Sequence, residues 1–458
     1  MSDDRALLTD IFAAALAAVD PTLVLAKQLQ ISNQGACLRQ RSGETLLPLL
    51  TPGAGGALRL IAIGKAAGPF ARAFCAEVAV DAGIVIAPLD APAQVAGLED
   101  IAADHPDAAA ASRAAADRLL QFIDAGRADD RYAVLLTGGA SALCALPIAG
   151  ISDGDKRQAV LAMMNAGASI AELNALRKHL SQLKGGRLAA RLAPAPIVTL
   201  AISDVPDDDP AVIGSGPTVA DPSTFADVQE SIRRYGIESE LPPAVLRHLS
   251  AGLAGQVEET PKAQDLAPQP YIVIASLDDA LEAARLRAQA QGFQVVSLGR
   301  SLYGEVADEA RRLARAVAQL QGDLQTDTQP GLSLAERGVL LMAGGEPSLR
   351  LVQSSAQQPG VGGRAQHLAL LLARELADRS GVTVLVAGTD GIDGRSPAAG
   401  GFADASTWKK IIAAGIDPEA ALVAANSHTA LGAAGDVFTT GRTMTNVADL
   451  VLISIRAS

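Results

Sequence analysis

Nine short apolar runs, most of them ending in glycine or a polar residue, constrain the fold of this 458-residue chain more than any other feature. Each run is nearly continuous in apolar residues, as expected for strands covered on both faces of a sheet. Alanine-rich amphipathic stretches follow the runs, an alternation typical of βαβ units around parallel sheets. The runs cover residues 58–64, 83–88, 132–139, 197–204, 271–276, 293–299, 338–346, 382–391 and 447–455. The sequence therefore predicts an α/β fold.

The runs form two series, and the chain between the series has the composition of a connection. Residues 250–270 contain three prolines together with Gly, Gln, Glu and Lys, and they show no sustained apolar period. A chain of 458 residues is long enough for two or three domains. We therefore expect an N-terminal α/β domain over 1–249, a connection over 250–270 and a C-terminal α/β domain over 271–458.

Charge and composition exclude several classes of partner. Lys and Arg total 38 against 50 Asp and Glu, which gives a net charge of -12 and no basic footprint for nucleic acid or an anionic membrane. The three cysteines, Cys37, Cys75 and Cys144, are too far apart for a zinc site or a disulfide framework. The most apolar stretch, 135–151, is broken by glycine and proline and is too short to span a bilayer. We expect a cytoplasmic protein that binds neither nucleic acid nor membrane; the sequence does not indicate its oligomeric state.

Polar, glycine-rich clusters follow six of the runs or lie close to them. Ligands of open α/β sheets bind where strands end and helices begin, so these clusters mark the candidate site. The clusters are 64–68, 137–143, 203–218, 344–349, 360–367 and 387–394.

Three common motifs do not fit these clusters. Lys65 has no glycine at the spacing of a Walker A loop and is followed by Ala66 instead of Ser or Thr. The segment 214–219 lacks the third glycine of a dinucleotide fingerprint, and an acidic loop precedes it. Ser141 lies in G-A-S-A-L, which is not a nucleophile elbow.

Several features indicate anion binding, and each has a plain structural alternative. Lys65 and Arg364 both follow glycine and open expected helices, where a cation and free amides face an anion; each is also compatible with a surface position. The loop 137–141 is either a backbone nest for an anion or a tight turn.

A basic helix face is the next such feature. The segment 174–189 places Asn174, Arg177, Lys178, Ser181 and Lys184 at helical spacings before Gly185 and Gly186. This face is either solvated or it binds a phosphate or carboxylate, and the residues alone leave both interpretations open.

Two acidic clusters indicate a divalent cation. Crowded carboxylates repel one another unless a cation offsets them, and Mg²⁺ typically uses only one or two of them together with substrate phosphates. The clusters comprise Asp204, Asp207, Asp208 and Asp209 in the first half and Asp390 and Asp393 in the second. For Asp207 and Asp209 an acidic turn is the preferred interpretation. The five histidines lack metal-ligand spacing, and we assign His105 and His248 structural roles.

Eight of these motifs, taken in order, resemble the class II glycerate 2-kinases, the family with a C-terminal MOFRL module. The motifs are GKAA, TGGASAL, NALRKHLSQLKGGRLA, SDVPDDDPAVIGSGPT, GGEPSL, GGRAQH, AGTDGIDG and TMTNVADL. The resemblance spans nearly the whole chain. It implies a Rossmann-like N-terminal domain, a MOFRL-type C-terminal domain and an active site in the cleft between them.

The resemblance also implies an activity and its cofactors. The family phosphorylates the 2-hydroxyl of D-glycerate with ATP and Mg²⁺ and gives 2-phosphoglycerate. Alternatives are a kinase of a related small hydroxy acid, an NAD(P)H-dependent hydroxypyruvate reductase and a sensor without turnover. Family members often carry the reductase label, but the missing G-x-G-x-x-G motif speaks against a nicotinamide site.

Site residues follow from the resemblance, position by position. Lys65, Arg364 and Asp204 are the implied catalytic residues. The implied substrate and nucleotide contacts are Gly138, Gly139, Ser141, Arg177, Lys184, Gly185, Gly345, Glu346, Thr389 and Asp390. The implied metal ligands are Asp204, Asp208, Asp390 and Asp393.

The chain departs from the family pattern at three places. It has Ala365 and His367 where the family usually reads GGRNQE, and Asp207 where SDVPGDD has glycine. It has Arg395-Ser396-Pro397 where the family often continues GIDGPT with Asp. These changes bear on nucleotide contacts and acceptor preference.

Overall fold

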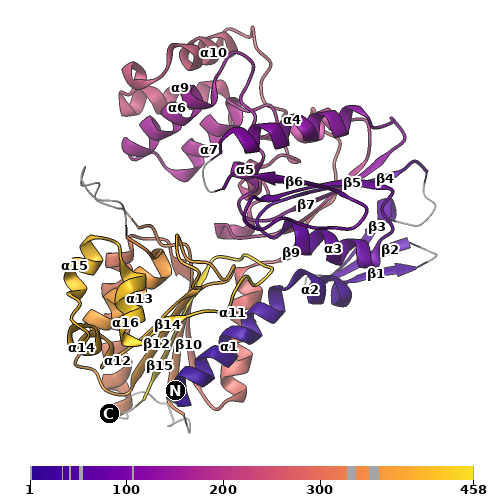
Figure 1. Ribbon diagram of the computed structural model, residues 1–458. Helices are drawn as coiled ribbons and strands as arrows, with labels where there is room; N and C mark the ends of the chain where they lie inside the picture. The colour runs from indigo at the N-terminus through magenta and orange to yellow at the C-terminus, as the bar shows by residue number, and fades with distance from the viewer. Residues whose placement is uncertain are drawn as a thin grey trace. The chain divides into compact units, whose positions relative to one another are not determined.

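The computed structural model describes residues 3–32, 35–40, 43–50, 55–105, 108–326, 337–349 and 360–456. It consists of two compact α/β units (Figure 1). The middle unit is Val24–Ile274, and the terminal unit combines Met1–Leu23 with Ala275–Ser458. The predicted α/β class is therefore confirmed. The expected domain limits differ from these units, because the first residues belong with the C-terminal half.

A six-stranded sheet forms the centre of the middle unit, in the order β6-β5-β4-β7-β8-β9. Its strands are β4 (Leu58–Ile63), β5 (Ala82–Pro88), β6 (Glu99–Ala103), β7 (Arg131–Leu136), β8 (Ile197–Ile202) and β9 (Tyr271–Ala275). β6, β5, β4, β7 and β8 pair in parallel, as expected, and helices α3 (Ala67–Glu77) and α4 (Ala110–Asp124) pack against them. β4, β7 and β8 are buried along their whole length, which explains their continuous apolar sequences.

Four further helices of the middle unit share a second core. They are α6 (Asp153–Asn165), α7 (Ile170–His179), α9 (Phe225–Tyr235) and α10 (Pro243–Leu253). Figure 1 shows them as a separate group beside the sheet of this unit. Capping boxes begin α6, α7 and α9, with Ser152, Ser169 and Thr224 as the N-cap residues.

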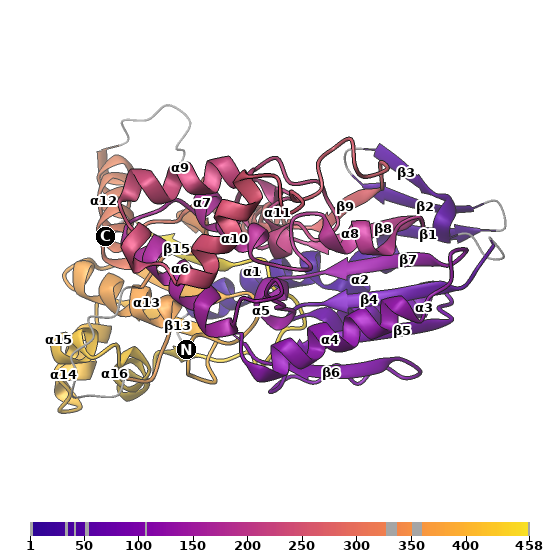
Figure 2. The same ribbon diagram turned by 90° about the horizontal axis from the view of Figure 1, so that it is seen from above.

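Shorter elements complete the middle unit. The helices are α2 (Pro21–Gln28), which begins in the terminal unit, α5 (Ala140–Leu143) and α8 (Arg187–Leu192), with 3₁₀ turns η1 (Pro48–Leu50), η2 (Pro206–Asp208), η3 (Ile213–Ser215) and η4 (Glu238–Glu240). β1 (Leu29–Ser32), β2 (Gly35–Gln40) and β3 (Gly43–Leu47) form a small antiparallel sheet, visible at the right of Figure 2.

The sheet of the terminal unit is mixed, which corrects the expectation of parallel strands there. Its order is β10-β11-β15-β12-β13-β14, and β15 runs antiparallel to both of its neighbours. The strands are β10 (Gln294–Leu302), β11 (Val339–Gly345), β12 (Val382–Gly388), β13 (Gly400–Asp404), β14 (Val437–Phe438) and β15 (Asp449–Ile455). The start of β15 therefore lies beside the carboxyl ends of β11 and β12.

Helices cover both faces of this sheet (Figure 1). α1 (Asp3–Val19) and α11 (Leu277–Ala290) pack on one face, and α12 (Val306–Thr326) and α13 (Arg364–Glu375) pack on the other. α14 (Thr407–Ala413), α15 (Pro418–Val423) and α16 (Ser427–Ala434) pack beside α13.

The first helix explains why the expected domain limit at the N-terminus differs from the observed unit. α1 buries Leu8, Ile11 and Phe12, and the Phe12 ring packs edge-on against Phe438 at 5.5 Å between centroids. Arg5 in the same helix pairs with Asp436 at 2.7 Å. An amphipathic helix carries no sequence signal that tells which of two cores it covers.

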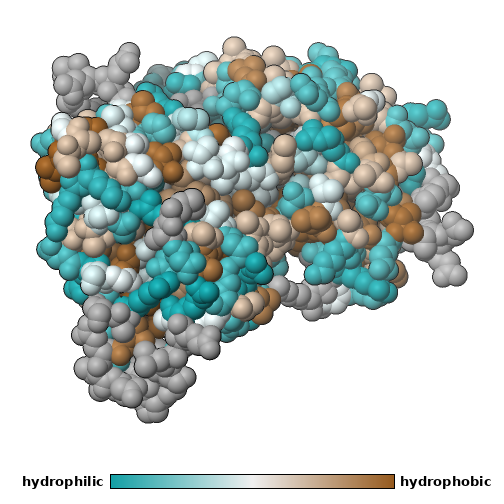
Figure 3. Space-filling view, turned by 60° about the horizontal axis from the view of Figure 1, so that its bottom comes forward, coloured by the Kyte–Doolittle hydropathy of each residue, from teal (hydrophilic) through white to brown (hydrophobic). Residues whose placement is uncertain are grey.

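No single helix in the described ranges is long and apolar enough to cross a membrane; only α1 and α2 together meet that criterion, across a bend of 53°. The face shown in Figure 3 is a mosaic of hydrophilic and hydrophobic residues.

Candidate active site

Three predicted site segments meet at one sheet edge of the middle unit. Lys65, Gly138 and Asp204 follow the adjacent parallel strands β4, β7 and β8, so they lie where the carboxyl ends of these strands come together. The Lys65 amide donates a hydrogen bond to the Gly138 carbonyl at 2.8 Å. We call this region the cationic edge.

Gly139 is required by the geometry of this edge. Its φ is +82°, and a Cβ there would lie 3.0 Å from the His105 ring and 3.1 Å from Lys65 Cγ. His105, to which the sequence analysis assigned a structural role, therefore lies against the Gly139 turn, as Lys65 does.

Ser141 links two motifs that are distant in sequence. Lys184 Nζ donates to the Ser141 carbonyl at 2.7 Å and also to Ser141 Oγ. Ser141 Oγ lies 3.1 Å from Ser215 Oγ, and the Gly185 amide donates to the Ser215 carbonyl at 3.0 Å. The structure thus brings Ser141, Lys184 and Gly185 together in the middle unit.

The basic helix face divides into two kinds of cation. Lys178 is buried and pairs with Asp221 at 3.2 Å, so it is part of an internal ion pair. Within the described chain, the side chain of Arg177 donates a hydrogen bond only to Asn174 Oδ1, at 3.4 Å. Lys184 is 4% exposed, and its ammonium group donates only to oxygens of Ser141 among the described residues. Burial lowers the pKa of Lys184 well below its usual value, and the charges of Lys156 and Arg177 lower it further.

Lys156 is a candidate that the sequence analysis missed. It lies in α6, within the segment Asp-Gly-Asp-Lys-Arg, and no motif distinguishes it from a surface lysine. Its Nζ is buried without a hydrogen-bond partner in the described part of the chain. Burial, followed by the charge of Arg177, lowers the pKa of Lys156 to about 8.

The acidic loop after β8 has a tight backbone. Asp207 and Asp208 have left-handed φ values of 59° and 52°. Asp207 stands where the family pattern has glycine, and aspartate is one of the few other residues that tolerate this conformation. Asp204 lies at the strand end, and Asp208 lies further along, in η2.

A second polar cluster lies at one sheet edge of the terminal unit, and Arg364 is its centre. Arg364 Nε donates to Asp449 Oδ2 at 2.6 Å, and its Nη2 donates to Glu346 Oε1 at 2.7 Å. Burial acts to lower the pKa of Arg364, but Asp449 and Glu346 raise it above its usual range. Arg364 is therefore an ion-paired residue and not an uncompensated anion clamp.

The strand order explains why these carboxylates meet. Asp449 begins β15, and its backbone is opposite Gly345 of β11 and Gly388 of β12. A Cβ on Gly388 would lie 3.2 Å from Asp449 Oδ1 and 3.3 Å from Asp390 Oδ1. Glu346, Asp390 and Asp449 thus form what we call the acidic edge. Asp449 was missed, although TMTNVADL contains it, because an antiparallel neighbour was not expected.

Thr389 and Asp393 have structural partners. Thr389 Oγ1 donates to the Ala448 carbonyl at 2.6 Å and accepts from the Val447 amide at 2.8 Å, which holds the start of β15. Asp393 accepts from the Ala365 and Gln366 amides at 3.1 and 2.8 Å and so caps α13. Burial raises the pKa of Asp393 to about 6.

The close approach of Asp393 also explains a glycine of the GGR motif. A Cβ on Gly363 would lie 2.2 Å from Asp393 Oδ1, so no side chain fits there. Two of the three departures from the family pattern lie at this helix start or contact it: Ala365 is fully buried, and Ser396 Oγ accepts a hydrogen bond from Gln366 at 2.5 Å.

The residues present fit a magnesium ion that substrate helps to bind. Across the described segments, no three His, Cys, Asp or Glu side chains are grouped to hold a metal on their own. Mg²⁺ commonly takes one or two carboxylates and completes its shell with water and phosphate oxygens. Asp390, beside Asp449 at the acidic edge, is suited to this use, whereas Asp393 is already committed to the cap of α13.

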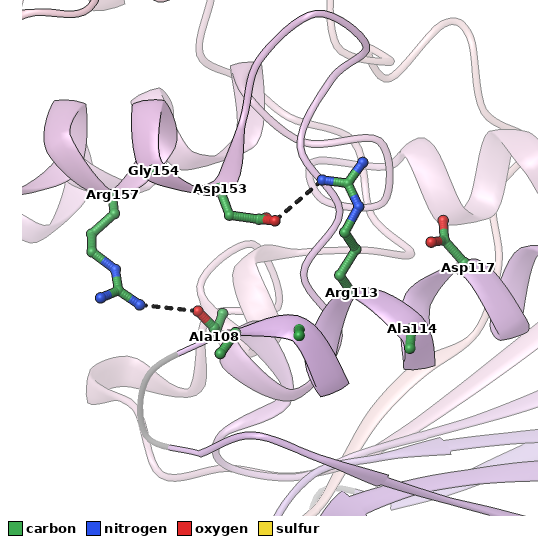
Figure 4. Close-up of a pocket in the computed structure, with 9 residues that line it drawn as sticks. Ala108, Arg113, Ala114, Asp117, Asp153, Gly154 and Arg157 are labelled. Atoms are coloured by element: carbon green, nitrogen blue, oxygen red, sulfur yellow. Dashed lines mark hydrogen bonds and ion pairs between the residues drawn. The ribbon is translucent and has the colours of Figure 1, made fainter.

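A hollow of about 450 Å³ lies elsewhere in the middle unit, between the starts of α4 and α6 (Figure 4). An ion pair of 3.2 Å between Arg113 and Asp153 crosses it, and Arg157 donates to the Ala108 carbonyl at 3.3 Å. None of its lining residues is a predicted site residue.

Comparison with protein families gives two matches. Residues 7–250 match the family described as a domain of unknown function, DUF4147, and residues 339–449 match the MOFRL family.

Among individual relatives, glycerate 2-kinase of Pyrococcus horikoshii is 34% identical over 96% of this chain and 94% of its own. D-glycerate 2-kinase of Thermotoga maritima is 34% identical over 86% of this chain and 89% of its own. A protein of Agrobacterium vitis, provisionally named a hydroxypyruvate reductase, is 37% identical over 98% of this chain and 94% of its own.

Two solved structures have the same fold over the full length of both chains. Glycerate kinase of Thermotoga maritima superposes with a TM-score of 0.77 at 31% identity, and a protein of Pyrococcus horikoshii OT3 superposes with a TM-score of 0.74 at 31% identity. The chain therefore belongs to the MOFRL family of class II glycerate 2-kinases.

Proposed function

We propose that this enzyme transfers the γ-phosphoryl group of Mg-ATP to the 2-hydroxyl of D-glycerate and releases 2-phosphoglycerate. The observation that carries the proposal is that one unit has a cationic edge and the other unit has an acidic edge. Phosphoryl transfer needs positioning and neutralisation of charge more than covalent chemistry, and these edges supply cations and metal-binding oxygens. The names of the relatives from Pyrococcus horikoshii and Thermotoga maritima support the same reaction.

The cationic edge would hold the anionic reactants. Lys65 lies between the end of β4 and the start of α3, and its backbone amide is held by the Gly138 carbonyl. Lys184 Nζ is held by the Ser141 carbonyl. Asp204, at the end of β8, is assigned as the group that accepts the proton of the 2-hydroxyl.

The acidic edge would hold the metal. Asp390 and Asp449 would bind Mg²⁺, which when bound neutralises charge on the nucleotide phosphates. Burial raises the pKa of Asp449, and Glu346 and Asp390 add to this rise while Arg364 opposes it. Arg364 thus orients two carboxylates, and we assign it this positioning role in place of direct phosphate binding.

Phosphorus NMR of the purified protein with Mg-ATP and D-glycerate tests the proposal. We expect growth of a 2-phosphoglycerate resonance, and we expect Lys65→Met to abolish it while Arg157→Gln, a surface change on α6, leaves it intact. Absence of any phosphorylated product, together with oxidation of NADPH when hydroxypyruvate is supplied, would instead support the reductase named among the relatives.

A further inference from the structure

Lys156 has an environment that its neighbours within the fold do not explain. Its Nζ is buried, and no described atom accepts a hydrogen bond from it. α6, which carries Lys156, packs on α7, which carries Arg177. α7 in turn contacts η3, and η3 contacts α5, so Ser215 and Ser141 belong to the same packed group.

Among the described residues, no carboxylate forms an ion pair with Lys156, Arg177 or Lys184. Arg177 and Lys184 make their side-chain hydrogen bonds to the neutral residues Asn174 and Ser141, as far as the described chain shows. The charge of Asp153 partly opposes the lowering of the Lys156 pKa, but Asp153 also pairs with Arg113 at 3.2 Å near the surface.

The adjacent residue Lys178 shows the contrast. It lies one position from Arg177 on α7 and has a buried carboxylate partner, Asp221. Burying cations without a counter-charge costs folding free energy, so an arrangement of this kind is expected where an anionic ligand supplies that charge.

We propose that Lys156, Arg177 and Lys184, together with the hydroxyls of Ser141 and Ser215, form a binding site for a phosphate group. The proposal rests on the proposed kinase function, which brings phosphate compounds to this enzyme. A phosphate group carries close to two negative charges at neutral pH and has three acceptor oxygens, whereas a carboxylate carries one charge and has two oxygens. Three cations and two hydroxyls therefore match phosphate better than the carboxylate of glycerate.

The phosphate can come from the nucleotide or from the phosphorylated product, since both present the same tetrahedral oxyanion. The site explains why Lys156, in a helix without any motif, has an inward-facing ammonium group. Ligand binding would also raise the pKa of Lys156 from about 8 towards its ordinary value.

Isothermal titration calorimetry of the full chain with inorganic phosphate tests the site without requiring turnover. We expect Lys156→Met to weaken phosphate binding at least about tenfold, since it removes a charge-assisted hydrogen bond. Lys156→Arg should keep most of the affinity, and Arg157→Gln, the exposed neighbour on the same helix, should leave it unchanged. Displacement of the bound phosphate by ADP or by 2-phosphoglycerate identifies the natural source.

A stability measurement guards against misfolding as the explanation. Lys156→Met removes an uncompensated buried cation, so its urea midpoint should equal or exceed that of the parent protein. Unchanged phosphate affinity in Lys156→Met, or loss of D-glycerate binding alone, overturns the proposal. If phosphate binding depends on Lys156 but the protein forms no 2-phosphoglycerate, the kinase function is refuted and the phosphate site remains supported. If the protein forms 2-phosphoglycerate and Lys156→Met changes neither phosphate binding nor turnover, the phosphate site is refuted and the kinase function remains supported.

Discussion

The guanidinium of Arg364 contacts two carboxylates, and these contacts determine what the residue can do. The sequence shows only a glycine-glycine-arginine step before a helix, which is compatible with a clamp for phosphate. In the fold, Asp449 and Glu346 accept hydrogen bonds from Arg364 at 2.6 and 2.7 Å. Asp449 is 4% exposed, so its charge depends on Arg364 for compensation.

Removing Arg364 should therefore reduce stability as well as turnover. We expect Arg364→Ala to lower the free energy of unfolding by about 3–5 kcal/mol, because Asp449 loses its partner in a buried position. Adding Asp449→Asn should recover a large part of this loss, which urea denaturation of the single and double variants would measure. If Arg364→Ala is as stable as the parent, Arg364 is instead available to bind a substrate anion.

The sequence could point to candidate residues inside contiguous motifs, but it could not point to residues that only tertiary packing brings together. Lys65, Ser141 and Lys184 stand in motifs that resemble the family, and the structure places them at one sheet edge or beside it. Asp449 joins Arg364 only because β15 pairs antiparallel with β11. Lys156 joins Arg177 only because α6 packs on α7.

At the scale of elements, α13 has site residues in its first turn, and most of its remaining residues are buried. Asp393 caps its first turn, and Arg364 projects to the acidic edge from the same turn. His367, one turn later, is 7% exposed and its Nδ1 has no partner within the described segments. Burial, followed by the charge of Arg374, lowers the pKa of His367 to about 4.

This histidine should make the protein sensitive to acid. In the unfolded chain its pKa is near 6.5, so the unfolded state takes up a proton as the pH falls from 7 towards 4 while the folded state does not. We expect His367 to cost about 2 kcal/mol of stability at pH 5 relative to pH 7.

The variant His367→Gln isolates this effect. Its stability should fall less than that of the parent between pH 7 and pH 5, as judged from urea midpoints at both values. Asp393 titrates in the opposite sense in this range, since its raised pKa favours the folded state in acid, but it is present in both proteins and its contribution cancels. Parallel pH profiles for the two proteins would show that His367 is not a buried neutral group.

At the scale of the whole molecule, the chain crosses between its units twice. The α/β class and most strands could be predicted from apolar runs, because continuous hydrophobicity reflects burial on both faces. The unit to which α1 belongs could not be predicted, because the elements that α1 packs against, α11 and β15, come more than 250 residues later in the chain. A hydrophobic helix face indicates that the face is buried, but it does not identify the element that covers it.

Because α1 packs on the terminal unit, we can predict how a change in α1 affects the unfolding of each unit. Phe12 is almost fully buried against Phe438, so Phe12→Ala should destabilise the terminal unit by about 3–5 kcal/mol. Hydrogen exchange measured by mass spectrometry should then show faster exchange in β12 and β15, with β4 and β7 unchanged. Phe70→Ala, a fully buried phenylalanine in α3, is the matched control and should produce the opposite pattern. Equal loss of protection in both units would mean that the chain unfolds as one cooperative body, and that the first helix stabilises the whole protein and not the terminal unit alone.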